Sequence, residues 1–235
     1  MTTWLSLDGA LAALAVGTLV ALGLGWAGLA LLCAFFLSST LLTPAGGRRT
    51  ADQVIANGGV AATAALLAPG HPAWAAAFAG ALAAAAADTW STEIGARSRR
   101  APRLITTGFL VASGTSGGVT WLGTAAGATG AAFIAAAAVL LGLARPWGAA
   151  MVGIGGFAGC LADSLLGATL QARYRCPGCG AAGETPRPCC GRPAALAGGL
   201  RWMTNDTVNL LATLAGAGVA VLPFVAGVAT PPLPQ

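Results

Sequence analysis

Lysine is absent from this chain of 235 residues, and charged residues of every kind are scarce. Only 8% of the residues are charged and 56% are hydrophobic, whereas about 25% of the residues in a soluble globular domain are charged. The mean hydropathy is +0.76. This composition excludes an ordinary soluble domain and predicts an integral membrane protein.

Histidine and acidic residues are also few, which limits the side chains available for acid–base or metal chemistry. The single histidine, His71, lies between Gly70 and Pro72, and we interpret it as an ordinary turn residue. The net charge of +5 comes from arginines that cluster between apolar runs and do not form a continuous stripe. This clustering indicates membrane topology and argues against nucleic-acid binding.

The apolar runs predict an all-α polytopic membrane protein with about seven transmembrane helices, within a range of six to eight. A spanning helix needs about 20 mostly apolar residues. Several runs are shorter and need flanking polar residues, a tilt or a break to cross the bilayer. The candidate spans are residues 9–25, 28–42, 54–68, 73–87, 119–143, 149–170 and 208–228.

The arginines predict the orientation of these helices, because cytoplasmic loops carry the excess of Lys and Arg. With seven spans, every arginine except Arg145 falls on one side. We therefore expect a cell (inner) membrane protein with its N-terminus inside and its C-terminus outside. The cytoplasmic side carries a Gly/Thr-rich, structured or re-entrant loop (98–118) and a small Cys-rich insertion (171–203), both within a single transmembrane domain (1–235).

Four of the seven carboxylates lie in or beside apolar runs: Asp88, Glu93, Asp163 and Asp206. An ionisable group inside a span costs at least about 2.5 kcal/mol on insertion scales, so these residues are functional candidates. The predicted orientation places all four at cytoplasmic helix ends, where they can meet. The alternative is that each pairs with a loop arginine or caps a helix, and capping explains Asp206 as well as function does. We interpret the remaining carboxylates, Asp8, Asp52 and Glu184, as surface charges.

Oxygen and amide side chains beside these carboxylates suit Mg²⁺, which takes one or two carboxylates plus substrate phosphates. Residues 105–118 (ITTGFLVASGTSGG) form a Gly/Ser/Thr-rich loop whose backbone N–H groups can contact phosphate oxygens. The same composition is also typical of a flexible linker. The arginines next to this loop suit phosphate recognition, although the positive-inside rule is a sufficient explanation for most of them.

Four cysteines in the insertion, Cys176, Cys179, Cys189 and Cys190, have the spacing of a small zinc knuckle. A cytoplasmic location argues against stable disulfides and for a structural Zn²⁺. Adjacent Cys189 and Cys190 can hardly both bind in ideal geometry, so three thiolates plus another group is one arrangement. A reduced, metal-free loop is the alternative.

Seven runs carry a resemblance that covers nearly the whole chain. They are FFLSSTLLT (35–43), QVIANGGVAA (53–62), ADTWSTEIG (87–95), PRLITT (102–107), GTSGGVTWLG (114–123), DSLLGATLQ (163–171) and NDTVN (205–209). In the same order, these runs resemble the integral membrane family of domain of unknown function 92, the transmembrane protein 19 and plant phytyl-phosphate kinase family. The resemblance implies a kinase that converts a prenyl monophosphate to the diphosphate with Mg²⁺ and CTP or another nucleotide.

The resemblance and the carboxylates together suggest roles for individual residues. Asp88, Asp163 and Asp206 would coordinate Mg²⁺, and Glu93 would hold a second metal or an arginine. The partners expected are an isoprenoid lipid phosphate, a nucleotide and the membrane, with a homo-oligomer left open. A cation- or proton-coupled transporter, a lipid flippase and a lipid-phosphate cytidylyltransferase are the alternatives. The residues expected to bind substrate or nucleotide are Asn57, Arg103, Thr106, Thr107, Thr115, Ser116, Gly117, Gly118, Ser164, Asn205 and Asn209.

Overall fold

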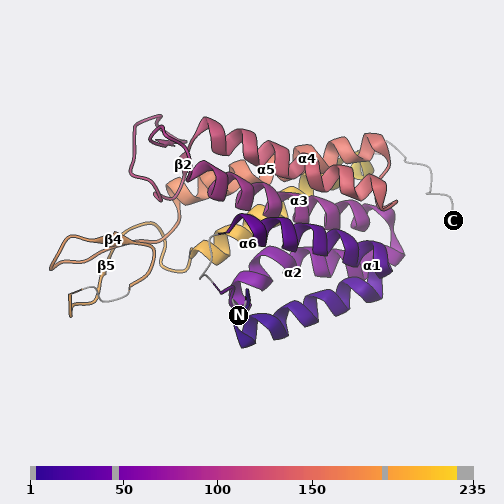
Figure 1. Cartoon of the computed structure of the whole chain (residues 1–235), viewed down its shortest axis with the longest axis horizontal. Coiled ribbons are helices and arrows are strands. Elements are labelled where there is room, and N and C mark those ends of the chain that lie inside the picture. The colour runs from indigo at the N-terminus through magenta and orange to yellow at the C-terminus, as the bar shows by residue number, and fades with distance from the viewer. Residues whose placement is uncertain (1–3, 44–47, 187–189, 227–235) are drawn as a thin grey trace.

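A computed structural model describes residues 4–43, 48–186 and 190–226, and most of these residues are helical (Figure 1). By length and hydropathy, four of the described helices qualify by themselves as membrane spans, namely α1, α4, α5 and α6. The helices are α1 (Leu7–Leu42), α2 (Ala51–Leu67), the short 3-10 helix η1 (Ala68–Gly70), α3 (Pro72–Gly95), α4 (Trp121–Leu140), α5 (Pro146–Thr169) and α6 (Asn205–Val225).

Helix α1 consists of two antiparallel halves joined at Gly25. Gly25 has φ 58° and ψ −150°, a backbone conformation that is essentially restricted to glycine. The chain reverses direction within α1 (Figure 1), and the rings of Trp4 and Phe36 at the far end of the hairpin are 6.4 Å apart. The two halves match the predicted spans 9–25 and 28–42. Counted this way, the described chain has seven long helical segments, which confirms the predicted all-α membrane fold.

Helix α3 continues past residue 87, where the predicted apolar span ends. The helix runs to Gly95 and therefore includes Asp88 and Glu93. A helix is held by backbone hydrogen bonds and can continue beyond the last apolar side chain. In this turn the polar side chain of Thr89 is also accommodated, because its hydroxyl donates to the Ala85 carbonyl at 2.9 Å. Helix α6 likewise begins before the predicted residue 208, at Asn205.

Small residues allow α3, α5 and α6 to pack closely. Residues 77–87 of α3 are all buried. A Cβ added at Gly80 would lie 2.6 Å from the Gly216 carbonyl of α6, and one added at Gly155 would lie 2.6 Å from the same oxygen. Glycine and alanine permit this approach between helices in a membrane, where hydrophobic burial does not drive association.

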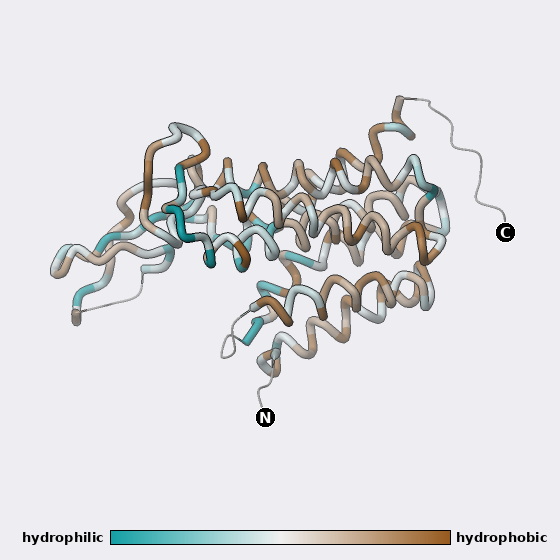
Figure 2. Tube along the Cα trace, turned by 45° about the horizontal axis from the view of Figure 1, so that its top comes forward, coloured by the Kyte–Doolittle hydropathy of each residue, from teal (hydrophilic) through white to brown (hydrophobic). Residues whose placement is uncertain are grey.

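The two polar segments both contain short strands and lie at the end of the bundle nearest the N-terminus (Figure 1). Hydrophilic residues concentrate towards this end (Figure 2). The segment between α3 and α4 pairs β1 (Arg103–Leu104) with β2 (Gly118–Val119), and the Cys-rich insertion forms a three-stranded antiparallel sheet in the order β4-β3-β5. The strands of the insertion are β3 (Arg173–Arg175), β4 (Ala182–Gly183) and β5 (Ala195–Gly198).

Candidate functional site

The packing of α3 against α5 brings two carboxylates together. Both helices run towards the end of the bundle that carries the loops (Figure 1), and a Cβ added at Gly159 would lie 2.5 Å from the Cβ of Ala84. Asp88 and Asp163 each follow these contact residues by four positions, which places them one turn further along on the same helix faces. The two carboxylates interact directly as a result.

The carboxylate pair lines a cavity of about 530 Å³. We call its charged and amide lining residues the polar end and its apolar lining residues from α1 the apolar wall. Its charged and amide lining comes from α2, α3, α5, α6 and the segment before α2, and most of its apolar lining comes from both halves of α1. The charged and amide residues of the lining are Arg48, Arg49, Gln53, Asn57, Asp88, Glu93, Asp163, Asn205 and Asn209. The apolar wall includes Ala13, Val16, Leu29, Leu32, Phe35 and Phe36.

One oxygen of this pair, Asp163 Oδ2, is buried and accepts no hydrogen bond from any described residue. An unsatisfied buried carboxylate oxygen is costly, and most buried polar atoms in proteins are paired. A cation or a hydrogen-bond donor in the cavity would satisfy this atom. The chemistry of the lining therefore favours a ligand that carries positive charge to the Asp88–Asp163 pair.

Arg49 supplies positive charge to the same cavity, and hydrogen bonds hold its backbone in place. Its N–H donates to the Trp4 carbonyl at 3.1 Å, and its own carbonyl accepts from the Ser6 N–H at 3.2 Å and the Ser6 hydroxyl at 3.0 Å. The guanidinium lies 5.5 Å from the centre of the Phe36 ring. Burial lowers the pKa of Arg49 below its ordinary value, while the negative charge of Glu93 raises it. Arginine remains protonated in proteins, so this side chain is a fixed cation.

Amide side chains from two helices complete the polar end. Asn205 and Asn209 lie four residues apart on α6, and Gln53 and Asn57 lie four residues apart on α2, so each pair occupies one helix face. Asn57 donates from Nδ2 to the Gln53 carbonyl at 3.0 Å. Gln53 accepts from the Thr50 N–H at 3.1 Å and closes the capping box of α2.

Six of the residues expected from sequence meet in this cavity, and the others lie outside its lining. Those that meet are Asn57, Asp88, Glu93, Asp163, Asn205 and Asn209. Those outside the lining are Arg103, Thr106, Thr107, Thr115, Ser116, Gly117, Gly118, Ser164 and Asp206.

Asp206 lies in the first turn of α6 without capping it. The N-cap is Thr204, whose hydroxyl accepts from the Thr207 N–H at 3.3 Å. Asp206 is close enough to Asp52 of α2 for the two carboxylates to repel each other. Asp206 thus faces a different carboxylate from the Asp88–Asp163 pair and lies outside the cavity lining.

The Gly/Thr-rich loop packs against the end of α5. Gly117 has a positive φ of 77°, and a Cβ added there would lie 2.4 Å from the Cβ of Ala168 and 2.6 Å from the Ser164 carbonyl. The Ser116 hydroxyl donates to the carboxylate of Glu184 in the Cys-rich insertion. Arg103 donates from Nη1 to the Gly108 carbonyl at 2.7 Å within the loop. These contacts connect the loop to α5 and the insertion, next to the cavity.

Sequence reasoning missed the roles of Arg48, Arg49 and Gln53 as lining residues. The available signal was local: two arginines and an amide stand directly before and within the first turn of an apolar helix. Of the expected zinc ligands, Cys176, Cys179 and Cys190 lie together, whereas Cys189 falls outside the described residues.

Comparison with known families and proteins identifies relatives of this chain. Residues 1–217 match the family described as Integral membrane protein DUF92. The chain is 32% identical over 214 residues to an uncharacterized membrane protein, MJ0933, of Methanocaldococcus jannaschii, covering 84% of this chain and 76% of the relative. It is 31% identical over 183 residues to Protein PGR of Arabidopsis thaliana, covering 60% of this chain and 64% of that protein.

A second plant relative is Protein VTE6, chloroplastic, of Arabidopsis thaliana, which is 27% identical over 243 residues, covering 94% of this chain and 66% of that protein. The chain thus spans slightly less than two thirds of each plant relative. No solved structure matches. Since the family model covers most of its length, the chain belongs to the integral membrane protein family DUF92.

Proposed function

We propose that this protein is a membrane-embedded kinase that transfers a phosphoryl group from CTP or another nucleotide to an isoprenyl monophosphate. The observation that carries the proposal is the cavity that joins the Asp88–Asp163 pair and Arg49 to an apolar wall on α1. The sequence resemblance to the transmembrane protein 19 and plant phytyl-phosphate kinase family supports the same activity.

The lining suits an amphipathic ligand with an anionic head. An isoprenyl chain would lie against the apolar wall, where Val16, Leu29 and Leu32 offer no hydrogen-bonding side chains. The phosphate would lie at the polar end, within reach of the Arg48 and Arg49 guanidinium groups, which suit phosphate oxygens. A volume of about 530 Å³ is within the range of pockets that enclose small molecules.

The donor set at the polar end fits Mg²⁺. Asp88 and Asp163 supply carboxylate oxygens, one of which is buried without a described partner, and Asn205 and Asn209 supply amide oxygens. Hard oxygen ligands of this kind, with substrate phosphates, are typical of Mg²⁺. When bound, Mg²⁺ would neutralise charge on the phosphoryl oxygens. Asp206 stays outside the proposed ligand set because it does not line the cavity.

The reaction needs alignment and charge neutralisation more than acid–base chemistry. An oxygen of the prenyl phosphate forms a bond to the terminal phosphorus of the nucleotide, and the bond from that phosphorus to the bridging oxygen breaks. The nucleoside diphosphate leaves with the bonding electron pair. The prenyl phosphate oxygen is already anionic, so no general base is required, and Arg49 and the amides would orient the phosphates.

We further propose that the arginine-rich end of the bundle faces the cytoplasm of the cell membrane, where nucleotides are available. The positive-inside rule supports this orientation. Arg48 and Arg49 line the cavity, and the described arginines of the two polar segments belong to the end of the bundle that carries these segments, whereas Arg145 is the N-cap of α5, which starts at the other end (Figure 1).

Product analysis tests the activity. Purified protein in lipid nanodiscs is incubated with Mg²⁺, CTP labelled in the γ-phosphate, and a panel of prenyl monophosphates, and the products are identified by mass spectrometry. The proposal predicts label in a prenyl diphosphate. A CDP-linked lipid would identify a cytidylyltransferase, and ion or lipid flux in proteoliposomes without nucleotide turnover would identify a transporter or flippase; either result overturns the kinase proposal.

A further inference from the structure

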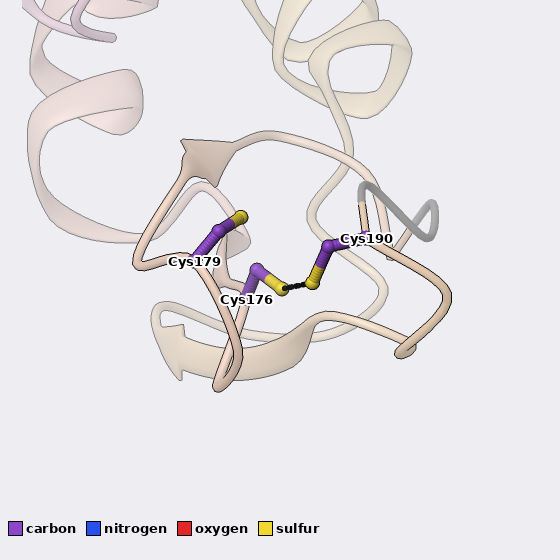
Figure 3. A group of neighbouring side chains, drawn as sticks. All are labelled: Cys176, Cys179 and Cys190. Carbon is purple, nitrogen blue, oxygen red and sulfur yellow. Dashed lines mark hydrogen bonds between the residues drawn. The ribbon is translucent and has the colours of Figure 1, made fainter.

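The Cys-rich insertion gathers three thiols from two segments of its sheet (Figure 3). Cys176 directly follows β3, Cys179 lies in the turn after it, and Cys190 precedes β5. The three Sγ atoms all lie within 4.8 Å of one another, and those of Cys176 and Cys190 are 3.4 Å apart. Cys176 is buried, with 2% of its surface exposed, whereas the other two are exposed.

These distances fit a metal better than a disulfide. A disulfide has an S–S distance of about 2.05 Å, well below the 3.4 Å between Cys176 and Cys190. In a tetrahedral site with Zn–S bonds of about 2.3 Å, sulfur atoms lie roughly 3.8 Å apart. The Cys176–Cys190 distance of 3.4 Å lies just below this value, and all three Sγ–Sγ distances stay within 4.8 Å.

The backbone around the thiols is built for their close approach. The Cys176 carbonyl accepts from the Gly180 N–H at 2.9 Å, which closes the turn that carries Cys179, and Gly180 has a positive φ of 74°. A Cβ added at Gly178 would lie 2.7 Å from Cys190 Sγ, so a side chain there would displace the third thiol. In this turn, which brings Cys176 and Cys179 close to Cys190, the positive φ falls on a glycine, which adopts it without steric cost.

The thiol cluster is linked through the sheet to the end of the bundle that contains the cavity. Tyr174 and Arg175 of β3, just before Cys176, pair with Gly183 and Ala182 of β4. Glu184 follows β4 directly and accepts a hydrogen bond from Ser116 of the Gly/Thr-rich loop.

The same loop reaches α5 one residue later. Gly117 packs on Ser164 and Ala168, and Ser164 is the neighbour of Asp163. Contacts therefore run without a break from the thiols to the helix that carries one of the paired carboxylates.

We propose that Cys176, Cys179 and Cys190 bind one Zn²⁺, which holds the insertion against the Gly/Thr-rich loop beside the cavity. Binding releases the protons of the three thiols, since thiolates are the ligands. Three thiolates leave the fourth tetrahedral position to water or another donor. This zinc is structural and its presence does not depend on the kinase activity.

Metal analysis of the full chain tests the site. Protein purified in detergent is loaded with Zn²⁺ and dialysed, and the expected content is about one zinc per chain by mass spectrometry of the metal. Cys176→Ser and Cys179→Ser should each lose most of the zinc, whereas Cys33→Ser, a cysteine of α1, should keep it. Less than about a tenth of a zinc per wild-type chain, or equal loss in Cys33→Ser, would overturn the proposal.

Two further measurements use the wild-type chain, so a misfolded variant cannot decide the outcome. Co²⁺ in place of zinc should give thiolate-to-metal charge-transfer absorption, and a spectrum showing only oxygen and nitrogen ligation contradicts the site. Removal of zinc with a chelator should speed tryptic cleavage after exposed Arg175, the residue directly before Cys176. Cleavage at the same rate with and without zinc contradicts the bracing role.

Discussion

Replacing Gly159 by alanine should separate the two helices that carry the paired carboxylates. The added Cβ would lie 2.5 Å from the Cβ of Ala84 on α3 and 2.7 Å from the Ala212 carbonyl on α6. Ordinary contacts begin at about 3.4 Å, so α5 must move by roughly 1 Å. Neither neighbouring atom can relax by a change of rotamer, because one is a Cβ and the other belongs to the backbone.

The magnitude follows from this displacement. Overpacking of a close-packed core costs about 1–3 kcal/mol, so the thermal unfolding midpoint of Gly159→Ala should fall. Asp88 and Asp163 lie one turn beyond the contact, and a shift of about 1 Å at a reacting centre can cost roughly 100-fold in rate. We therefore expect phosphoryl transfer to fall more steeply than stability.

Gly148 on the same helix provides the matched control. A Cβ added there meets nothing within 4 Å, so Gly148→Ala should leave packing unchanged and raise helix stability by up to about 1 kcal/mol. Both variants are compared by thermal unfolding in one detergent and by product formation in nanodiscs. If Gly159→Ala is as stable and as active as Gly148→Ala, close helix packing does not position the carboxylates.

Three further predictions concern the cavity, the hairpin and the topology. Arg49→Ala should raise the KM for the prenyl phosphate at least about tenfold, as expected for a lost charge-assisted contact, with Arg49→Lys intermediate; an unchanged KM contradicts phosphate binding by Arg49. Gly25→Ala should destabilise the chain by about 1–3 kcal/mol through backbone conformation alone, since a Cβ there meets no atom within 4 Å, whereas Gly70→Ala should not; equal stability of the two variants refutes this. Alkaline phosphatase fused after residue 142 should be active in a bacterial host and inactive when fused after residue 108; the reverse pattern contradicts the proposed orientation.

The sequence predicted the helices well because apolar runs and glycine turns are local signals. The predicted span that matches α3 ends at Ala87, where the apolar run stops, while the helix continues through Asp88 to Gly95. The hairpin at Gly25 was expected as two spans, and its backbone conformation explains how they are joined without a loop.

The site was harder to predict because its lining is contributed by segments far apart in the chain. Asp88 and Asp163 stood out as carboxylates in apolar runs, but their contact depends on the Ala84–Gly159 packing, which no single run reveals. Arg49 had a sufficient explanation in membrane topology, so its position beside Glu93 was not predicted. The amide residues Asn205 and Asn209 on α6 were expected from their helical spacing around Asp206 and from the run NDTVN.

The most direct test of the central claim is the effect of neutralising the paired carboxylates on diphosphate formation. Asp88→Asn and Asp163→Asn each replace a carboxylate oxygen by an amide nitrogen with little change in shape, and Asp52→Asn does the same at an exposed carboxylate outside the cavity lining. In nanodiscs with Mg²⁺, CTP and a prenyl monophosphate, we expect Asp52→Asn to match the wild type and the other two variants to lose at least about 100-fold in rate. If Asp88→Asn and Asp163→Asn both form the diphosphate at the wild-type rate, the pair is not the catalytic centre.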